Sequence, residues 1–233
     1  WSPRRGLLGR WLFVALTAVL ALASVEARMA SETIYRLPRG GGEAGACLTP
    51  ILQARRTTRS FAPRSISETQ VGRLLWAAQG ISSPEGYRTA PSAGALYPLE
   101  LHLVAGDVEG LAAGSYRYDP PRHALTATIR GDLRDAVAQA ALNQRWIAGA
   151  PAVVVISAVE ARTTAKYGRR GIRYVHMEVG HASQNLLLQA VALGLAAAVV
   201  GAFDDGALER VLQLPGEEHP LAILPVGHPL GRR

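Results

Sequence analysis

The sequence predicts an α+β sandwich, a fold in which helices pack against a central sheet. Segments with strand and helix patterns alternate irregularly along the chain, whereas a doubly wound α/β fold would alternate them regularly. No Gly-x-Gly-x-x-Gly motif follows a predicted strand, which argues against a Rossmann domain. The 233 residues suit one domain that buries a substantial core.

The first predicted helix has well-defined ends. Ser67 followed by Gln70 forms a capping-box pattern, and apolar residues then keep helical spacing until Gly80. Two shorter helices are predicted from the same periodicity, over residues 132–142 and 206–212. Strands are predicted where apolar residues alternate with polar ones or form β-branched runs: residues 99–105, 115–118, 125–129, 152–158, 197–200 and 221–226. An Asp-Pro-Pro turn joins the second and third strands into a hairpin.

The longest predicted helix runs from Tyr174 to Leu193 and ends at Gly194, a residue type that is common at helix C-termini. Its apolar positions occupy much of the circumference, so we expect it to be buried on several sides and to lie in a dimer interface. His176 and His181 on this helix are five residues apart. That spacing does not place them on one helical face, and no metal site is predicted.

The first 27 residues have the pattern of an export signal. Three arginines precede an apolar run over residues 11–25, and small or aliphatic residues stand before a cleavage point after Ala27. We therefore expect a signal peptide over residues 1–27, and the Arg4-Arg5 pair resembles a twin-arginine signal for export to the periplasm. The alternatives are an uncleaved anchor, or translation from Met29 and a cytoplasmic protein.

Residues 28–47 are predicted to be a Gly-rich linker, and residues 48–233 the folded domain. The net charge of +7 is gathered in arginine clusters rather than along one stripe. This distribution argues against a nucleic-acid-binding module and fits anionic ligands better. Cys47 is the only cysteine, so neither an internal disulfide nor a cysteine metal site is expected.

Two segments have features suited to binding phosphate. Residues 55–59 read Arg-Arg-Thr-Thr-Arg and offer three guanidiniums, which bind phosphate oxygens in a bidentate manner, with two hydroxyls beside them. Residues 91–98 read Pro-Ser-Ala-Gly-Ala-Leu-Tyr-Pro. Gly94 there gives a permissive backbone beside the hydroxyl of Ser92, so a ligand can approach main-chain donors.

Together with the C-terminal segments described next, these two segments resemble the FMN-dependent nitroreductase superfamily over about residues 48–229. The sequence is more similar to its SagB/ThcOx-type dehydrogenase branch, flavoenzymes that oxidise azoline rings in modified peptides. The resemblance implies a nitroreductase-like sandwich with a central, mainly antiparallel sheet, an obligate homodimer, and FMN between the subunits. It implies that residues 91–94 reach the flavin from the partner subunit.

The resemblance also implies which residues bind the flavin. Residues 200–203 match the segment whose backbone lies along the flavin ring in relatives, the alternative being a simple strand-to-helix turn. The full set of implied cofactor-binding residues is Arg55, Arg56, Thr57, Arg59, Pro91, Ser92, Ala93, Gly94, Gly201, Ala202 and Phe203.

A Lys-Tyr pair is the implied catalytic group. Lys166 and Tyr167 precede an Arg-Gly-x-Arg-Tyr run, and the SagB-type enzymes resemble this chain in having both features. Azoline oxidation removes a proton from carbon while hydride passes to flavin N5, so a base is required. The alternative is that Lys166 is a solvated residue in an arginine-rich loop. Ala95 and Tyr97 stand where common nitroreductases have Asn and Gln, which moves the expectation away from simple nitro-group reduction.

The expected function is therefore an FMN-dependent oxidoreductase that passes hydride between a small-molecule or peptide-derived substrate and flavin N5. An exported enzyme would meet little soluble NAD(P)H, which favours an oxidase or dehydrogenase. The alternatives are an NAD(P)H-dependent nitro- or quinone reductase, which gains weight if translation begins at Met29, and a non-catalytic flavin-binding partner protein.

Overall fold

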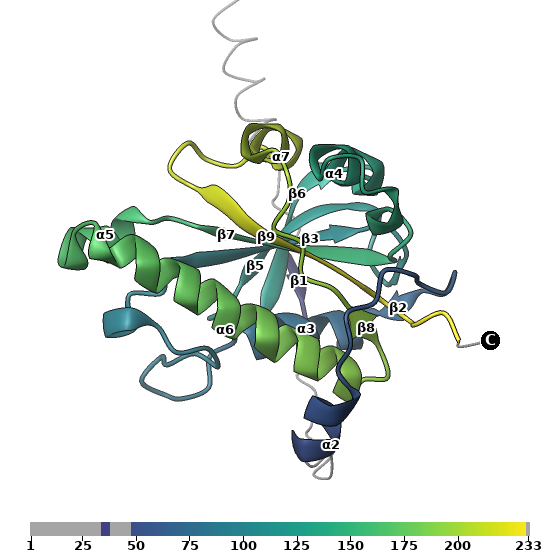
Figure 1. The fold of residues 1–233 in the computed structure, drawn as a ribbon, viewed down its shortest axis with the longest axis horizontal. Coiled ribbons are helices and arrows are strands. Elements are labelled where there is room, and N and C mark those ends of the chain that lie inside the picture. The colour runs from purple at the N-terminus through teal and green to yellow at the C-terminus, as the bar shows by residue number, and fades with distance from the viewer. Residues whose placement is uncertain (1–33, 38–47, 232–233) are drawn as a thin grey trace, which may run out of the picture. The chain divides into compact units, whose positions relative to one another are not determined.

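Seven strands form the central sheet of the computed structural model, which describes residues 34–37 and 48–231 (Figure 1). Each neighbouring pair in this sheet is antiparallel. The order across the sheet is β1 (Ile34–Arg36), β6 (Ala124–Arg130), β5 (Gly114–Asp119), β3 (Leu99–Ala105), β7 (Ala152–Ala158), β9 (His219–Gly227) and β8 (Ala196–Ala197). A separate parallel pair joins β2 (Ile66–Ser67) to β4 (Val108–Glu109).

The centre of the sheet is buried on both faces. β3 and β7 pair without interruption from Leu99↔Ala158 to Ala105↔Ala152. Because successive side chains of a strand point to opposite faces, Val154 and Ile156 of β7 enter one core while Val153 and Val155 enter the other. The run of β-branched residues in β7 is therefore explained by burial on both sides.

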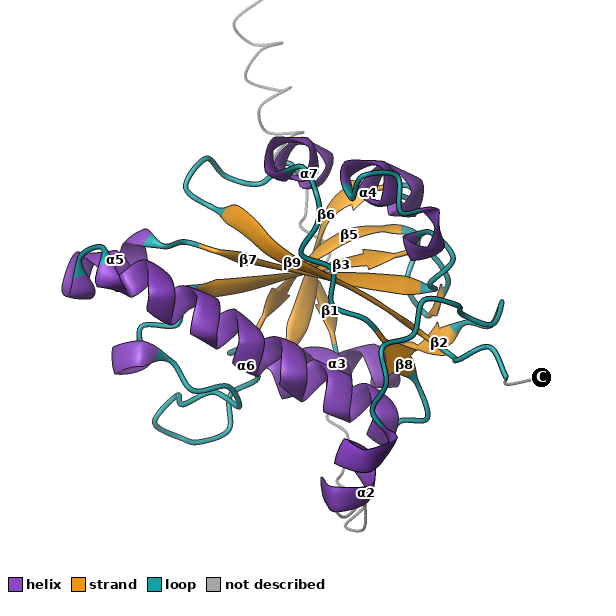
Figure 2. Cartoon of the chain, viewed as in Figure 1, coloured by secondary structure: helices purple, strands orange, loops and turns teal. Residues whose placement is uncertain are grey.

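Helices cover the two faces (Figure 2). On one face lie α3 (Glu68–Gln79) and α6 (Arg170–Ala192), and on the other lie α4 (Arg134–Ala140) and α7 (Asp205–Leu212). The remaining helices are α2 (Leu48–Ala54), α5 (Ala161–Tyr167) and the short 3-10 turns η1 (Ala93–Ala95) and η2 (Arg145–Ile147). α2 contacts α6, and α5 leads directly into it.

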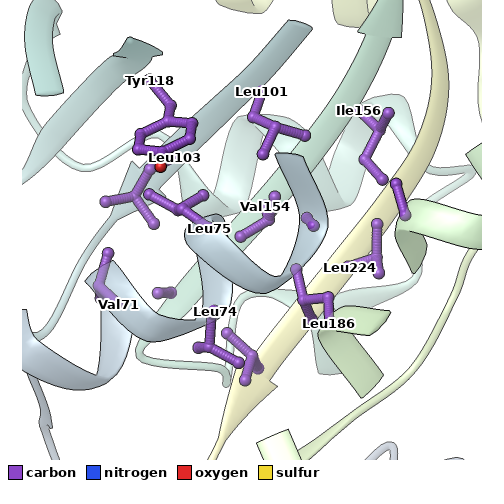
Figure 3. Packing of buried hydrophobic residues seen from close by; sticks show 14 of the residues in the cluster. Val71, Leu74, Leu75, Leu101, Leu103, Tyr118, Val154, Ile156, Leu186 and Leu224 are labelled. Carbon is purple, nitrogen blue, oxygen red and sulfur yellow. The ribbon is translucent and has the colours of Figure 1, made fainter. Parts of the chain in front are cut away.

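The larger core lies between the sheet and the α3–α6 layer (Figure 3). Leu75 of α3 and Leu186 of α6 are fully buried against strand residues that include Leu101 and Leu103. Full burial of one such leucine stabilises the fold by about 1.5–3 kcal/mol relative to exposure. The two helices are thereby fixed against the sheet, and the loops that leave their ends take fixed positions.

The predicted α+β sandwich with a mainly antiparallel sheet is confirmed. The first helix begins as expected: the Ser67 hydroxyl accepts the Gln70 backbone N–H, and the Gln70 side chain accepts the Ser67 N–H. Both strands of the predicted hairpin pair in the sheet as β5 and β6. Gly194 after α6 has a φ of 68°, the left-handed conformation that favours glycine at a helix end.

Three segments differ clearly from the predictions. α6 begins at Arg170 rather than Tyr174, and its N-cap Arg169 makes no side-chain capping hydrogen bond, so no capping residue marks the start in the sequence. Of residues 197–200, only Ala197 belongs to a strand, and Val200 makes an isolated bridge to Ile223. β1 pairs with β6 inside the segment predicted to be a linker, because three residues are too few to show strand periodicity.

The exposure of α6 also differs from the prediction. One side of the helix packs in the core, but Met177 is 55% exposed and Ile172 is 36% exposed on the other side. His176 and His181 are exposed there as well. Within one chain the helix is therefore buried on one side only.

The predicted signal peptide and most of the predicted linker lie outside the described residues, as does Cys47. The described residues all belong to one compact unit of the chain. Among the helices of that unit, none is long and apolar enough to span a membrane.

Candidate active site

The basic segment lies beside the end of the sheet. Thr57 forms a parallel bridge with Ala197 of β8, and the Thr58 backbone N–H donates to the Ala197 carbonyl at 3.2 Å. The Arg59 guanidinium lies 5.8 Å from the centre of the Trp146 ring. Arg56 donates through Nη1 to the carbonyls of Gln53 and Arg55, at 2.8 Å each. Backbone pairing therefore fixes the segment, while its guanidiniums remain largely exposed.

Residues 200–203 lie close to the same region. The Gln144 side chain donates to the Ala202 carbonyl at 3.0 Å, and Gln144 is two residues from Trp146, which contacts Arg59. Gly201 and Ala202 are exposed, and Phe203 packs on the core beneath α4 and α7. The structure thus brings the predicted residues of the basic segment together with Gly201, Ala202 and Phe203.

The Pro-Ser-Ala-Gly segment forms a tight turn with unusual backbone. Gly94, Ala95 and Tyr97 have φ values of 65°, 54° and 47°. The Tyr97 N–H donates to Ser92 Oγ at 2.9 Å and closes the turn. A Cβ placed on Gly94 would lie 2.8 Å from Tyr167 Oη and 3.1 Å from Lys166 Nζ, so only glycine fits there without displacement.

Lys166 and Tyr167 lie in the last turn of α5, so the alternative that placed Lys166 in a loop is wrong about its secondary structure. The helix was not recognised because its short sequence carries neither an N-cap side chain nor a clear apolar stripe. The Tyr167 and Tyr174 rings meet edge to face at 5.2 Å, and Lys166 Nζ is 5.4 Å from the Tyr167 ring centre. The pair therefore sits directly against the turn that carries Gly94.

The predicted residues form two groups at opposite ends of α6. Gly94 contacts Tyr167, just before the helix begins, whereas Thr57 pairs with Ala197, just after it ends. Figure 1 shows α5 at one end of α6, and α2 and β8 at the other. A helix of 23 residues spans about 35 Å, so one chain does not unite the two groups.

A buried polar cluster connects the Gly94 turn to α6, and sequence reasoning missed it. Glu178 of α6 is 2% exposed, and burial raises the pKa of its carboxyl to about 7, although Ser92, Arg88 and Gln79 act to lower it. Arg88 donates to Gln79 Oε1 at 2.8 Å, and its guanidinium lies 4.6 Å from the Tyr97 ring centre. Glu178 was detectable, because it lies on the same helical stripe as the apolar core residues one turn before and after it.

A second buried cluster joins three strands. Glu218, just before β9, shares its Oε1 with His102 Nε2 and Ser157 Oγ, at 2.5 Å each. All three side chains are buried, and the serine hydroxyl donates to the carboxylate rather than to the imidazole. A nucleophilic serine requires a base that takes its proton and access to substrate, so this cluster is a structural tie rather than a hydrolytic triad.

A sequence model of the nitroreductase family matches residues 52–228, a range that covers most of the chain and includes both groups of predicted site residues. The chain belongs to the nitroreductase family. It is 42% identical to MJ1384 of Methanocaldococcus jannaschii, a protein provisionally named a nitroreductase, over 180 residues that cover 77% of this chain and 90% of that protein. The sequence-based assignment to this superfamily is confirmed.

Solved structures agree with the family. A protein of Ralstonia eutropha JMP134, also provisionally named a nitroreductase, has a TM-score of 0.74 at 26% identity, covering 87% of this chain and 92% of its own. A chain of the Escherichia coli microcin synthetase McbBCD complex shares the fold, with a TM-score of 0.64 at 23% identity, covering 90% of this chain and 82% of its own. As a nitroreductase-family member, the protein is an oxidoreductase.

Proposed function

We propose that this nitroreductase-family enzyme is an FMN-dependent homodimer of the SagB/ThcOx-like type, which oxidises a small-molecule or peptide-derived substrate. The observation that carries the proposal is the contact of Gly94 with Lys166 and Tyr167. This contact brings together two sequence features that resemble that branch, the Gly-Ala-Leu-Tyr-Pro motif of residues 94–98 and the Lys166-Tyr167 pair.

The donor set at residues 55–59 suits the phosphate of FMN. Arg56 and Arg59 are exposed, Arg55 is half-buried, and Thr57 offers an exposed hydroxyl. In the described part of the chain, none of these arginines pairs with a carboxylate. Three uncompensated guanidiniums beside a hydroxyl match a dianionic phosphate in charge and geometry. Arg55, Arg56, Thr57 and Arg59 would hold the phosphate, and the exposed backbone at Gly201 and Ala202 would face the ring.

A second copy of the chain would unite the two groups of residues. The exposed side of α6 carries a groove of about 520 Å³ lined by Arg169, Ile172, Arg173, His176 and Met177. α2 at the far end of the helix buries none of its residues, and Leu48 and Leu52 are exposed on it. If two copies pack with these helices side by side and antiparallel, residues 91–94 of one copy approach residues 55–59 of the other.

Lys166 and Tyr167 are the residues we assign to proton transfer. Bound FMN would supply the hydride acceptor, and the substrate must lose a proton as well. In the dimer proposed above, the Lys166 ammonium or the Tyr167 phenol, both next to Gly94, would meet a substrate bound over the partner's cofactor. Either side chain, in its deprotonated form, can accept a proton from carbon, and Tyr174 orients the Tyr167 ring by edge-to-face contact.

Export to the periplasm remains part of the proposal, resting on residues 1–27 of the sequence. Outside the cytoplasm, oxygen or another acceptor would remove the electrons. An NAD(P)H-dependent nitro- or quinone reductase is the second candidate, favoured by the name of the Methanocaldococcus jannaschii relative. The two candidate functions are distinguished by adding NADPH, NADH or an azoline-containing peptide to the FMN-loaded protein without oxygen and measuring the flavin absorbance. Rapid bleaching by a nicotinamide would favour the reductase, and bleaching by the peptide alone would favour the SagB-like enzyme.

The FMN assignment itself is tested by a double substitution. Arg55→Ala with Arg59→Ala should weaken FMN binding at least about a hundredfold, because each charge-assisted contact is worth about 1.5–3 kcal/mol. Arg130→Ala with Arg210→Ala is the matched control, since it removes two exposed arginines elsewhere. The Kd of all three proteins is measured by quenching of flavin fluorescence. A wild-type protein that stays colourless after reconstitution with FMN would refute the proposal.

A further inference from the structure

Arg162 of α5 makes two contacts with the segment that leads from the Gly94 turn into β3. Its Nη1 donates to the Tyr97 carbonyl at 3.2 Å, and its Nη2 lies 2.7 Å from Oε1 of Glu100. Tyr97 closes the turn that carries Gly94, whereas Arg162 precedes Lys166 by four residues on the same helix. One guanidinium therefore connects the Gly94 turn to the helix of the proposed proton-transfer pair.

Glu100 gives this guanidinium a fixed direction. Its backbone lies in β3 inside the central sheet, where it is the register partner of Ser157 in β7. Its side chain is 13% exposed, and Oε2 lies 3.0 Å from Nη2 of Arg117. Both carboxylate oxygens are thus paired with arginines. The planar fork of Arg162 presents one N–H group to this carboxylate and another to the Tyr97 carbonyl, so the two contacts define its orientation.

The carbonyl that Arg162 holds belongs to a residue with a strained backbone. Tyr97 has a φ of 47°, a left-handed conformation that a non-glycine residue keeps only when surrounding contacts impose it. The Tyr97 N–H donates to Ser92 Oγ at 2.9 Å, and the Tyr97 hydroxyl accepts the Arg88 backbone N–H at 3.3 Å. Those two hydrogen bonds lie within residues 88–97 and hold the loop to itself. The hydrogen bond from Arg162 ties it to another element, α5.

Global stability is a weak explanation for Arg162. Its side chain is 39% exposed, and ion pairs of partly exposed side chains contribute little to the free energy of unfolding. The effect of this pair is local, because it sets how closely the Gly94 turn approaches α5. A Cβ on Gly94 would lie 2.8 Å from Tyr167 Oη and 3.1 Å from Lys166 Nζ. A small movement of the turn would therefore change the surroundings of both side chains.

We propose that Arg162 is a positioning residue that holds the Gly94 turn against α5 by binding the Tyr97 carbonyl. Glu100 orients its guanidinium, and the proton-transfer pair gains a fixed place beside the turn. The inference rests on the proposed function, because the turn and the pair belong to one active site only if the protein binds FMN. Arg162 acts through the turn, so its loss should disturb the pair without removing either of its functional groups.

Lys166 is the only lysine in the sequence, so its side chain can be observed alone. Protein labelled with carbon-13 at the ε position of lysine gives an NMR spectrum of this one side chain. Its two ε protons have separate shifts when the side chain is held beside the Tyr167 ring, and they share one averaged shift when it moves freely. The wild type should show two shifts, and Arg162→Ala should reduce their separation by about half or more.

Arg134→Ala is the matched control, because Arg134 makes the same two kinds of contact on the opposite face of the sheet. Its Nη1 donates to the Ala150 carbonyl at 3.0 Å, and its Nη2 lies 2.6 Å from Oδ2 of Asp132. Arg134→Ala should leave the Lys166 shifts as they are in the wild type. Urea denaturation compares the stability of both variants. A purely structural role of Arg162 would lower stability and leave the Lys166 shifts unchanged.

FMN binding by the same proteins tests the consequence for the site. Residues 91–94 approach the partner's cofactor in the proposed dimer, so a released turn should bind it more weakly. The FMN Kd of Arg162→Ala, measured by fluorescence quenching, should rise about tenfold, whereas that of Arg134→Ala should stay within about twofold of the wild type. The proposal requires both effects in Arg162→Ala and neither of them in Arg134→Ala.

The outcomes are distinguishable. Unchanged Lys166 shifts in Arg162→Ala, or a single averaged shift in the wild type, would overturn the role of Arg162 while FMN binding leaves the proposed function standing. Absence of FMN binding by the wild type would overturn the proposed function and the role of Arg162 in it. If Arg162→Ala does not fold, Glu100→Gln decides, because it removes the charge that orients the guanidinium and should bring the two Lys166 shifts closer together.

Discussion

At the scale of single residues, Gly94 combines a backbone requirement for glycine with a packing requirement. Its φ of 65° favours glycine, and an added Cβ would meet the Tyr167 hydroxyl and the Lys166 ammonium. Both requirements act together, because the side chains that crowd Gly94 are the proposed proton-transfer pair. The missing side chain lets two functional groups approach the main chain of a proposed cofactor-binding turn.

If Lys166 and Tyr167 transfer the proton, their removal should slow flavin reduction without affecting flavin binding. Lys166→Ala and Tyr167→Phe should leave the FMN spectrum and the fold unchanged and slow substrate-driven flavin reduction by about 10²- to 10⁴-fold, the usual effect of losing a general base. Stopped-flow absorbance measures the rate with whichever reductant bleaches the wild type. Arg130→Ala removes an exposed cation elsewhere and should change nothing. A rate of flavin reduction within a few-fold of the wild type would show that the pair has no catalytic role. Loss of bound flavin would instead show that the two residues bind the cofactor.

At the scale of elements, the cluster of Glu218, His102 and Ser157 links β3, β7 and the start of β9. The other buried side chains of these three strands are apolar. Burial alone would raise the pKa of Glu218, but hydrogen bonds from His102 and Ser157 and the charge of Arg117 outweigh it and lower the pKa below its ordinary value. The carboxylate therefore stabilises the fold when ionised. Glu178 behaves oppositely, because its raised pKa means that ionisation costs stability as pH rises from about 4.5 to about 7.

Glu218→Gln should destabilise the protein by about 1.5–3 kcal/mol at pH 7, since it replaces the charged acceptor of the buried His102 and Ser157 hydrogen bonds with a neutral amide. A carboxyl with a lowered folded-state pKa contributes stability above its unfolded pKa and loses it as pH falls through the folded one. The difference between wild type and variant should thus shrink below about pH 4.5. Glu209→Gln, at the exposed pair with His219, should cost at most about 1 kcal/mol. Urea denaturation at pH 7 and pH 4 measures both, and a Glu218→Gln effect as small as that of Glu209→Gln would contradict the structural tie.

The elements that the sequence predicted well are those with local signals. Ser67 and Gln70 mark a helix start by their own hydrogen bonds, and the valines of β7 mark a strand buried on both faces. α5 and β1 lack such signals, since their form depends on packing against α6 and pairing with β6. The site residues came from the family resemblance, whereas the hydrogen bonds of Asn185 to Thr89 and of His102 to Glu218 join positions far apart in the chain and required the structure.

At the scale of the whole molecule, the division of the proposed site between the ends of α6 is the main feature. The arginines at residues 55–59 lie at one end, and Gly94 with Lys166 lies at the other. The exposed side of α6 between them carries apolar surface that one chain leaves open to solvent. If that surface is the contact between two copies, dimer formation and cofactor binding must be lost together.

Met177→Glu tests this dependence, because it places a charge on the exposed side of α6, where Met177 is 55% exposed. Burying an unpaired carboxylate in an interface is costly, so the variant should sediment as a monomer at concentrations where the wild type is a dimer. FMN affinity should fall in parallel, while the circular dichroism spectrum stays the same. Leu142→Glu is the matched control: Leu142 is 63% exposed and follows α4 on the opposite face of the sheet. A wild-type monomer that retains FMN in sedimentation would rule out the shared site, because one chain would then bind the cofactor with residues from a single end of α6.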